Sequence, residues 1–361
     1  MRKKSFFRAI LSVLVILSML ASIPVFAEEA NQDSLLVVTE EVPQDVIDYA
    51  INNVSAYFYP FELDYGENAS DYLLGYPFAL RNADSVQYIF PMVKNSKINY
   101  LFRVYEVKGQ WASVLDKGIS DELNQFINDK TPISLAVKNQ DIVVTKNGID
   151  TVLSANPHKT DDDIVLTSEI DNDHDSGAKL VEKDLFTPIL EQIPEIPATR
   201  APTSKLITLD LKEIQAKSGD NWCAGYSAAQ IVRRRTGRQF LAKDVATYAG
   251  ISSKIDPIPT SDIIGWADDT LAMYVTLESL GDYLYDSTVE TQIVLDAPIF
   301  LGLNSGYNYH ATVLRGYTAS VYSIWDPYWR TYYSISKTGD FVYKDNWSNE
   351  WVPNEWIIDW F

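Results

Sequence analysis

The chain has 361 residues, of which 46% are apolar and 22% are charged, and its formal net charge is −19. This composition is that of a globular protein, and the length predicts two domains at roughly 100 to 200 residues per domain. The negative charge argues against nucleic acid and an anionic membrane surface as partners, although it names no substrate.

The N-terminus has the pattern of a secretory signal peptide over residues 1–27. Four basic residues lie in the first eight positions, an almost wholly apolar run follows over 9–23, and Val25 and Ala27 are small residues two apart. No later apolar stretch approaches the roughly 20 residues that a bilayer-spanning helix needs. We therefore expect a secreted protein that has no membrane contact once the signal peptide is removed.

Residues 28–158 are predicted to form a small α+β domain without catalytic-looking residues. Apolar residues recur near helical spacing over 43–58, and Pro43 suits the first turn of a helix there. A second helix is expected over residues 111–127. The strand pattern around these helices places the domain in the α+β class.

Two hairpins are expected in the same domain. The β-prone runs 86–90 and 98–102 flank a polar turn, and Pro91 suits an edge position in that hairpin. The second hairpin is indicated by the turn signal Asn147-Gly148 after a β-branched run.

Residues 159–204 are acidic and then proline-containing, which predicts a linker. Four acidic residues of this stretch stand at positions 1, 3, 5 and 12 of a calcium-loop pattern, namely Asp171, Asp173, Asp175 and Glu182. Ser176 occupies position 6, where the sharp turn of such a loop needs glycine. We therefore expect a solvated acidic tether and no metal site.

Residues 205–361 are predicted to form a second α+β domain, in which helices come first and an antiparallel sheet follows. The expected helices cover 222–235, 243–248, 261–268 and 287–294. The expected strands cover 299–303, 311–317, 321–325, 331–335 and 341–343.

Cys223 is the only cysteine of the chain, so no internal disulfide can form. A free thiol in an exported protein is either buried and inert or kept because it reacts. The thiol lies at the start of the first helix of the second domain. The helix dipole and the unpaired N–H groups at that end favour a thiolate, so we interpret Cys223 as a nucleophile.

A thiolate nucleophile needs a proton carrier, and the chain has three histidines. His158 and His174 lie in or beside the acidic linker, which leaves His310 as the candidate within the second domain. Asp326 directly follows a predicted strand and can orient the imidazole, although an Asp before Pro327 also favours a simple turn.

The segment Asn221-Trp222-Cys223-Ala224-Gly225-Tyr226 resembles the active-site segment of the staphopain family and related bacterial papain-fold peptidases. His310, with the apolar strand that follows it, and Ile324-Trp325-Asp326-Pro327 resemble the second half of the same pattern. The staphopain family carries Asn as its third residue. The related peptidases of bacteriocin exporters carry Asp, as this chain does.

The resemblance implies a papain-like fold for residues 205–361 and a Cys223-His310-Asp326 triad. One position departs from the family pattern, because Lys217 stands where the glutamine that stabilises the oxyanion is normally found. Gln215, two residues earlier, is the predicted substitute. Asn221 or backbone N–H groups are the alternatives.

The resemblance further implies a secreted cysteine peptidase that needs no cofactor and acts on proteins or peptides. Residues 28–158 would be a propeptide that inhibits the enzyme intramolecularly, with Arg200-Ala201 as a processing site, or a permanently attached domain. Two other functions stay open. The triad could pass an acyl group to an amine, as transglutaminase-type enzymes do, or the tryptophan-rich tail 347–361 could make the protein a non-catalytic binder.

Overall fold

The computed structural model describes residues 33–82, 85–157, 179–196, 204–216, 219–280, 284–306, 308–337, 341–347 and 349–360. The described residues from Ser34 onward form one compact unit. We call its described residues up to 196 the N-terminal region and those from 204 the C-terminal region. The predicted signal peptide lies outside the described residues. In the described ranges, no helix combines the length and the apolar character needed to cross a bilayer.

The N-terminal region consists mainly of strands and has one long helix. Its elements are β1 (Leu36–Glu40), α2 (Gln44–Tyr65), η1 (Ala69–Asp71), β2 (Leu73–Gly75), β3 (Phe78–Asn82), β4 (Ser85–Lys94), β5 (Lys97–Val107), β6 (Gln110–Asp116), α3 (Ser120–Leu123), η2 (Asn124–Phe126), β7 (Ile133–Lys138), β8 (Asp141–Lys146), β9 (Ile149–Ser154), β10 (Leu180–Asp184) and β11 (Pro188–Leu190).

The C-terminal region places most of its helices before its strands. Its elements are β12 (Lys205–Leu206), α5 (Cys223–Thr236), α6 (Ala242–Tyr248), α7 (Thr260–Leu271), β13 (Thr276–Ser279), α8 (Asp286–Val294), β14 (Ile299–Asn304), β15 (Tyr309–Tyr317), β16 (Val321–Trp325), β17 (Tyr332–Ser336), β18 (Tyr343–Lys344) and β19 (Glu350–Ile358).

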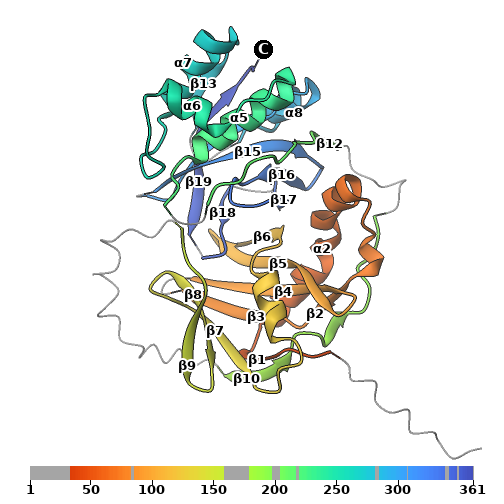
Figure 1. Cartoon of the computed structure of the whole chain (residues 1–361). Helices are drawn as coiled ribbons and strands as arrows, with labels where there is room; N and C mark the ends of the chain where they lie inside the picture. Colours follow the sequence, from red (N-terminus) through yellow and green to blue (C-terminus); the bar gives the residue numbers. More distant parts are fainter. Residues whose placement is uncertain are drawn as a thin grey trace, which may run out of the picture. The chain divides into compact units, whose positions relative to one another are not determined.

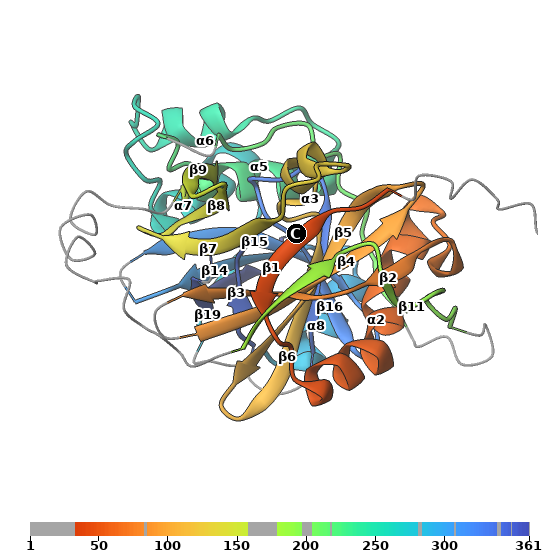
Figure 2. The same ribbon diagram turned by 90° about the horizontal axis from the view of Figure 1, so that it is seen from below.

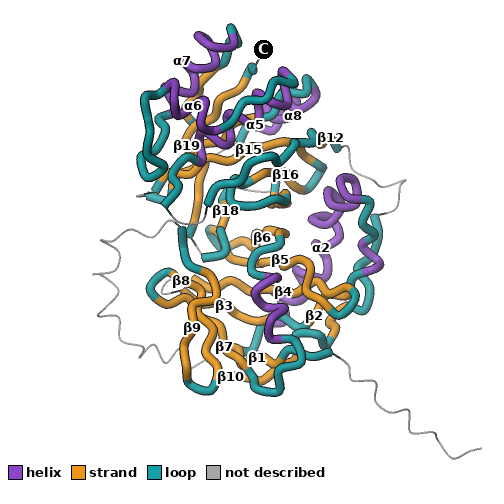
Figure 3. The backbone as a smooth tube through the Cα atoms, in the orientation of Figure 1, coloured by secondary structure: helices purple, strands orange, loops and turns teal. Residues whose placement is uncertain are grey.

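Strands from both regions belong to one large antiparallel sheet, whose order is β11-β2-β4-β5-β6-β17-β16-β15-β14-β19-β13. Helices α5 to α8 gather near the strands of the C-terminal region, with α5 and α8 against β14 and β15, and α2 packs against β5, β6, β16 and β17 (Figures 1 and 3). The smaller sheet, β10-β1-β7-β8-β9, belongs to the N-terminal region (Figure 2). The predicted mixed α+β class with an antiparallel sheet is confirmed.

Several predicted elements of the N-terminal region are present. Helix α2 covers the expected residues 43–58 almost completely and continues to Tyr65. Strands β4 and β5 form the first expected hairpin, and β8 and β9 form the second. Both turn residues of the second hairpin, Asn147 and Gly148, have positive φ angles, as the turn signal requires.

The helix predicted over residues 111–127 is wrong for its first half. Residues Gln110–Asp116 form strand β6, which pairs with β5 along its whole length. The helical residues are Ser120–Leu123 and Asn124–Phe126. The pairing partner decides this segment, because β5 offers a full row of backbone groups that a helix would leave unpaired.

Pro91 does not lie on an edge strand, because β4 has partners on both sides. Strand β3 pairs with β4 as far as Ile89, and β2 begins to pair at Met92. On this side of β4, Pro91 lies in the gap between two partner strands, a position that suits a residue without an N–H. On the other side it lies opposite Leu101 of β5.

The segment predicted as a linker differs in part from that expectation. Within it, β10 pairs with β1 and β11 pairs with β2, so residues 180–190 extend both sheets. Glu182 belongs to β10 and lies opposite Val38 of β1. The other three residues of the calcium-loop pattern lie outside the described residues, as do Arg200 and Ala201. The acidic composition of the segment did not predict these strands, because they form by pairing with β1 and β2, which lie far away in the sequence.

The two regions share one hydrogen-bonded sheet and common apolar cores. Strand β6 pairs with β17, with Val114 opposite Ile335 and Leu115 opposite Ser334. Val114 packs within the core of the C-terminal region, whereas Val321 of β16 packs in the core beneath α2. Trp347 likewise packs among apolar residues of the N-terminal region. No solvent-filled boundary therefore separates the two predicted domains along this joint.

A buried ion pair reinforces the joint. The Arg103 side chain is 1% exposed and pairs with Asp116, which is fully buried. The same guanidinium donates hydrogen bonds to the carbonyls of Lys344 and Asp345 at 2.7 and 2.8 Å. A second pair joins Arg315 of β15 to Asp64 of α2. An arginine of the N-terminal region is thus hydrogen-bonded to carbonyls of the C-terminal region, and an arginine of the C-terminal region is neutralised by a carboxylate of the N-terminal region.

We expect Arg103→Leu to lower the free energy of unfolding by about 3–5 kcal/mol, because Asp116 would remain buried without its partner. Urea denaturation followed by tryptophan fluorescence measures this change. The double variant Arg103→Leu/Asp116→Leu is the matched control, and it should lose less than the single variant. A single variant as stable as the unchanged protein would contradict the role given to this pair.

Candidate active site

Cys223 is the first residue of α5, and Trp222 precedes it without a side-chain cap. The N–H groups of the first turn therefore have no acceptor inside the helix. One turn later, the Ser227 hydroxyl donates to the carbonyl of Ala311 at 3.1 Å. Ser227 and Cys223 are four residues apart and so lie on the same helix face. This contact docks the start of α5 on β15 beside His310.

His310 and Asp326 come from neighbouring strands. His310 is the second residue of β15, and Asp326 directly follows β16. The register pairs Val313 with Trp325, which brings the two side chains to the same end of the strand pair. His310 Nε2 lies 3.1 Å from Asp326 Oδ2. Both side chains are nearly inaccessible to solvent, and the Asp326 carboxylate also accepts from the N–H of Tyr328.

The surroundings of His310 keep its ring protonated at neutral pH. Burial by itself lowers the pKa of His310, but the Asp326 carboxylate and a hydrogen bond with Cys223 outweigh it and raise the pKa to about 10. Because Nε2 faces Asp326, Nδ1 is the ring nitrogen available to exchange a proton on the thiol side.

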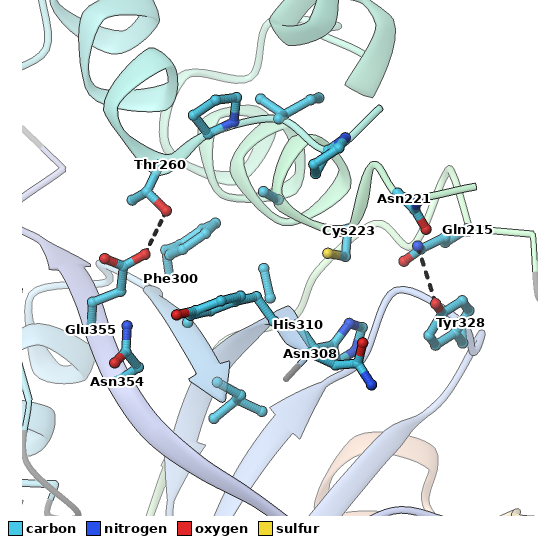
Figure 4. A pocket seen from close by; sticks show the side chains of 18 of the residues that line it. Gln215, Asn221, Cys223, Thr260, Phe300, Asn308, His310, Tyr328, Asn354 and Glu355 are labelled. Atoms are coloured by element: carbon cyan, nitrogen blue, oxygen red, sulfur yellow. Dashed lines mark hydrogen bonds between the residues drawn. The ribbon is translucent and has the colours of Figure 1, made fainter. Parts of the chain in front are cut away.

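Gln215 lines the same pocket as Cys223 and His310 and is 2% exposed. Its side-chain Nε2 donates to the carbonyl of Asp220 and lies 3.3 Å from the hydroxyl of Tyr328 (Figure 4). Its backbone N–H donates to Pro327 at 2.8 Å, which ties it to the residue after Asp326. The structure therefore brings together all four residues predicted from the sequence, although Lys217 lies outside the described residues.

The other groups that could donate a hydrogen bond to an oxyanion differ in the acceptors that they already have. Asn221 Nδ2 donates to the carbonyl of Ile255 at 2.7 Å, so this amide serves the neighbouring loop. The N–H of Cys223 has no acceptor inside α5 because it opens the helix. The backbone donor at Cys223 is therefore the one that an oxyanion would meet without breaking a hydrogen bond, whereas Gln215 Nε2 would first have to leave the Asp220 carbonyl or the Tyr328 hydroxyl.

A buried carboxylate organises the loop before the nucleophile. Asp220 accepts hydrogen bonds from Lys254 at 2.7 Å and from the Tyr226 hydroxyl at 2.9 Å, and also from the N–H of Trp222. The backbone carbonyl of Asp220 accepts a hydrogen bond from Gln215 Nε2. Asp220 thus fixes the segment between Gln215 and Cys223. Sequence reasoning did not assign it this role, because Lys254 lies 34 positions away.

Two aromatic residues that sequence reasoning missed enclose the imidazole. Tyr328 stacks on His310 with ring centres 5.3 Å apart, and Trp351 lies at 5.5 Å in a tilted arrangement. Their rings shield the His310–Asp326 contact from water, which strengthens it. Tyr328 follows Asp326-Pro327 in the sequence and could have been suspected from that position. Trp351 comes from β19, and only tertiary structure places it here.

A pocket of about 660 Å³ opens beside the thiol. Its walls include Ile258, Phe300 and Leu303, while Cys223 is partly exposed. Figure 4 shows Cys223 and His310 facing the same space. The N-terminal region contributes one lining residue, Pro157. A nucleophile, a buried base and an orienting carboxylate thus meet at an accessible pocket.

No protein-family model matches the chain. No curated protein is significantly similar to it either. The chemistry of the site therefore rests on the geometry above. Within the described residues, no three His, Cys, Asp or Glu side chains lie together as metal ligands would.

Proposed function

We propose that the protein is a secreted cysteine endopeptidase with a papain-like C-terminal region, as the sequence resemblance implies. The observation that carries the proposal is the contact of His310 with both Asp326 and Cys223 at the pocket. A reactive thiol, a proton carrier and an orienting group are the three parts that thiol-dependent acyl transfer needs.

The proposed reaction begins with attack of the Cys223 thiolate on a peptide carbonyl carbon. The Cys223 N–H and Gln215 stabilise the tetrahedral oxyanion, and the His310 imidazolium gives its proton to the leaving amine. A thioester remains on Cys223. Water then attacks the thioester while His310 accepts a proton, and this step releases the acid and restores the thiol.

We expect Cys223→Ala to abolish hydrolysis of casein and labelling by an epoxysuccinyl inhibitor. Because the chain has a single cysteine, any thiol label reports on Cys223 alone. Fluorescence-monitored casein hydrolysis and mass spectrometry of the labelled protein are the measurements. His310→Gln is the matched control: it keeps the thiol but removes the proton carrier, so labelling should be slow. Casein hydrolysis that survives in Cys223→Ala would end the proposal.

The acyltransferase alternative keeps the same triad and changes the acceptor from water to an amine. Mass spectrometry of a peptide substrate with and without a primary amine separates the two outcomes. The binder alternative loses the support of its aromatic tail, because the tryptophans at 347, 351, 356 and 360 are all buried.

We propose that the N-terminal region restrains the enzyme while it stays bound to the C-terminal region. Pairing of β6 with β17 and the buried Arg103 contacts favour a permanently attached region over a propeptide that leaves. We propose that cleavage of the linker leaves both parts bound to one another. The N-terminal sequences recovered from culture medium, for the protein and for its Cys223→Ala variant, show where and by which agent the chain is cut.

A further inference from the structure

The pocket beside Cys223 contains a carboxylate that the proposed reaction does not use. Glu355 of β19 is the only Asp or Glu among the lining residues, and no Lys or Arg lines the pocket. Within the described residues, the one hydrogen bond to its carboxylate comes from the Thr260 hydroxyl at 2.5 Å. Figure 4 shows Glu355 and Thr260 at the end of the pocket away from Gln215 and Tyr328.

The strand register fixes how far this carboxylate lies from the reacting atoms. Glu355 pairs with Gly302 of β14, and Gly302 pairs with Ala311, the residue after His310. Two strand spacings separate the backbone of Glu355 from that of Ala311, or about 10 Å. Substrate residues repeat at about 3.3 Å in an extended peptide, so Glu355 is within reach of a side chain close to the scissile bond.

A glycine in the intervening strand leaves room for the acidic side chain. A Cβ atom at Gly302 would lie 2.8 Å from Cγ of Glu355 and 3.2 Å from its Oε1. The Glu355 side chain therefore lies across β14 in the space that the glycine leaves. Thr260, at the start of α7, holds the carboxylate from the other wall.

The chemistry around Glu355 suits a long cationic side chain. Ile258, Phe300 and Leu303 supply apolar walls, against which the methylene stem of Lys or Arg can pack. The charged head then meets a carboxylate that pairs with no Lys or Arg among the lining residues. The net charge of −19 adds a long-range attraction for cationic substrates.

We infer that Glu355 is a specificity-determining residue that selects a Lys or Arg side chain within about two residues of the scissile bond. This inference rests on the proposed peptidase function. An acidic side chain at the same subsite is repelled, and a neutral polar one loses the charge-assisted hydrogen bond.

The test compares peptides that contain arginine with identical peptides that contain citrulline, which has the same shape without the charge. The pair is placed in turn at each of the two positions on either side of the scissile bond, and kcat/KM is measured. At one position the protein should cleave the arginine peptide about tenfold faster or more. In Glu355→Gln the ratio of kcat/KM for the arginine peptide to that for the citrulline peptide should fall to about one. Glu355→Lys should instead cleave a peptide with glutamate at that position faster than the arginine peptide.

Glu106→Gln is the matched control, because it removes the same charge from an exposed site on β5 outside the pocket and should keep the ratio. Thermal unfolding checks that each variant is folded. A ratio near one in the unchanged protein, with peptides still cleaved, overturns the inference while the proposed function stands. A ratio that persists in Glu355→Gln overturns it too. If no peptide is cleaved at any position, the proposed function fails and the inference fails with it.

Discussion

Expressed without residues 28–196, the segment 205–361 should fail to form a soluble, cooperatively folded protein. Removing the N-terminal region exposes the edge of β17, which loses its partner β6. It also uncovers apolar side chains that pack across the joint, Val321 and Trp347 among them. An unpaired apolar edge promotes aggregation.

Lost polar contacts add to this effect. The carbonyls of Lys344 and Asp345 lose their donor Arg103, and buried Arg315 loses Asp64. The Trp347 indole loses its acceptor, the carbonyl of Ser154. Each buried group left unpaired costs about 1–3 kcal/mol, and charged groups cost more. Together these losses are comparable to the usual stability of roughly 5–15 kcal/mol for a domain.

Size-exclusion chromatography and thermal unfolding of the fragment measure the result. The control is the full chain with a site-specific protease site inserted between residues 196 and 204. After cleavage, the two parts should co-elute and keep the melting temperature of the intact protein. A fragment that is monomeric and melts like the intact protein would instead support a propeptide that can leave.

Replacing Asp326 by Asn should lower both the pKa of His310 and the rate of peptide hydrolysis. Asp326 contributes more than Cys223 to raising the pKa of His310 against the opposing effect of burial. With a neutral amide in its place, Cys223 alone opposes the effect of burial, so the pKa of His310 falls. Proton transfer to the leaving amine is then weakened, and we expect kcat/KM to fall about tenfold, a moderate loss because the family that the site segment resembles carries Asn at this position.

Histidine-selective ¹⁵N NMR tests the pKa change directly, because the chain has only three histidines. His310→Gln identifies the resonance by its absence. In the unchanged protein this ring should stay protonated at pH 8 and lose its proton near pH 10. Tyr328→Phe is the control, because it keeps the ring stacked on His310. An Asp326→Asn variant with an unchanged titration of His310 would contradict the assignment.

The raised pKa of His310 also predicts how the stability of the protein depends on pH. The folded pKa of His310, about 10, lies above the unfolded value of about 6.5, so the folded state binds the proton more tightly. The stabilisation is fully present below pH 6.5 and is lost as the pH rises through 10. In that window it falls by about 1.4 kcal/mol per pH unit, and the difference between the unchanged protein and His310→Gln isolates it.

The sequence alone was enough for the local features of the site. One cysteine at a helix start, one histidine outside the linker and an Asp after a strand were readable because each depends on neighbouring residues and on composition. Helix α2, the two hairpins and the order of helices and strands in the C-terminal region followed from periodicity and turn residues for the same reason.

Only tertiary structure decided the features that depend on distant pairing. Strand β6 replaced a predicted helix because β5 offered it a partner, and β10 joined a sheet although its composition resembled a linker. The nearness of Gln215 to Cys223 depends on Asp220 and a lysine in another loop. Glu355 reaches the pocket through two strand pairings. Contacts between residues far apart in the chain leave no periodic signal, so sequence patterns could not reveal them.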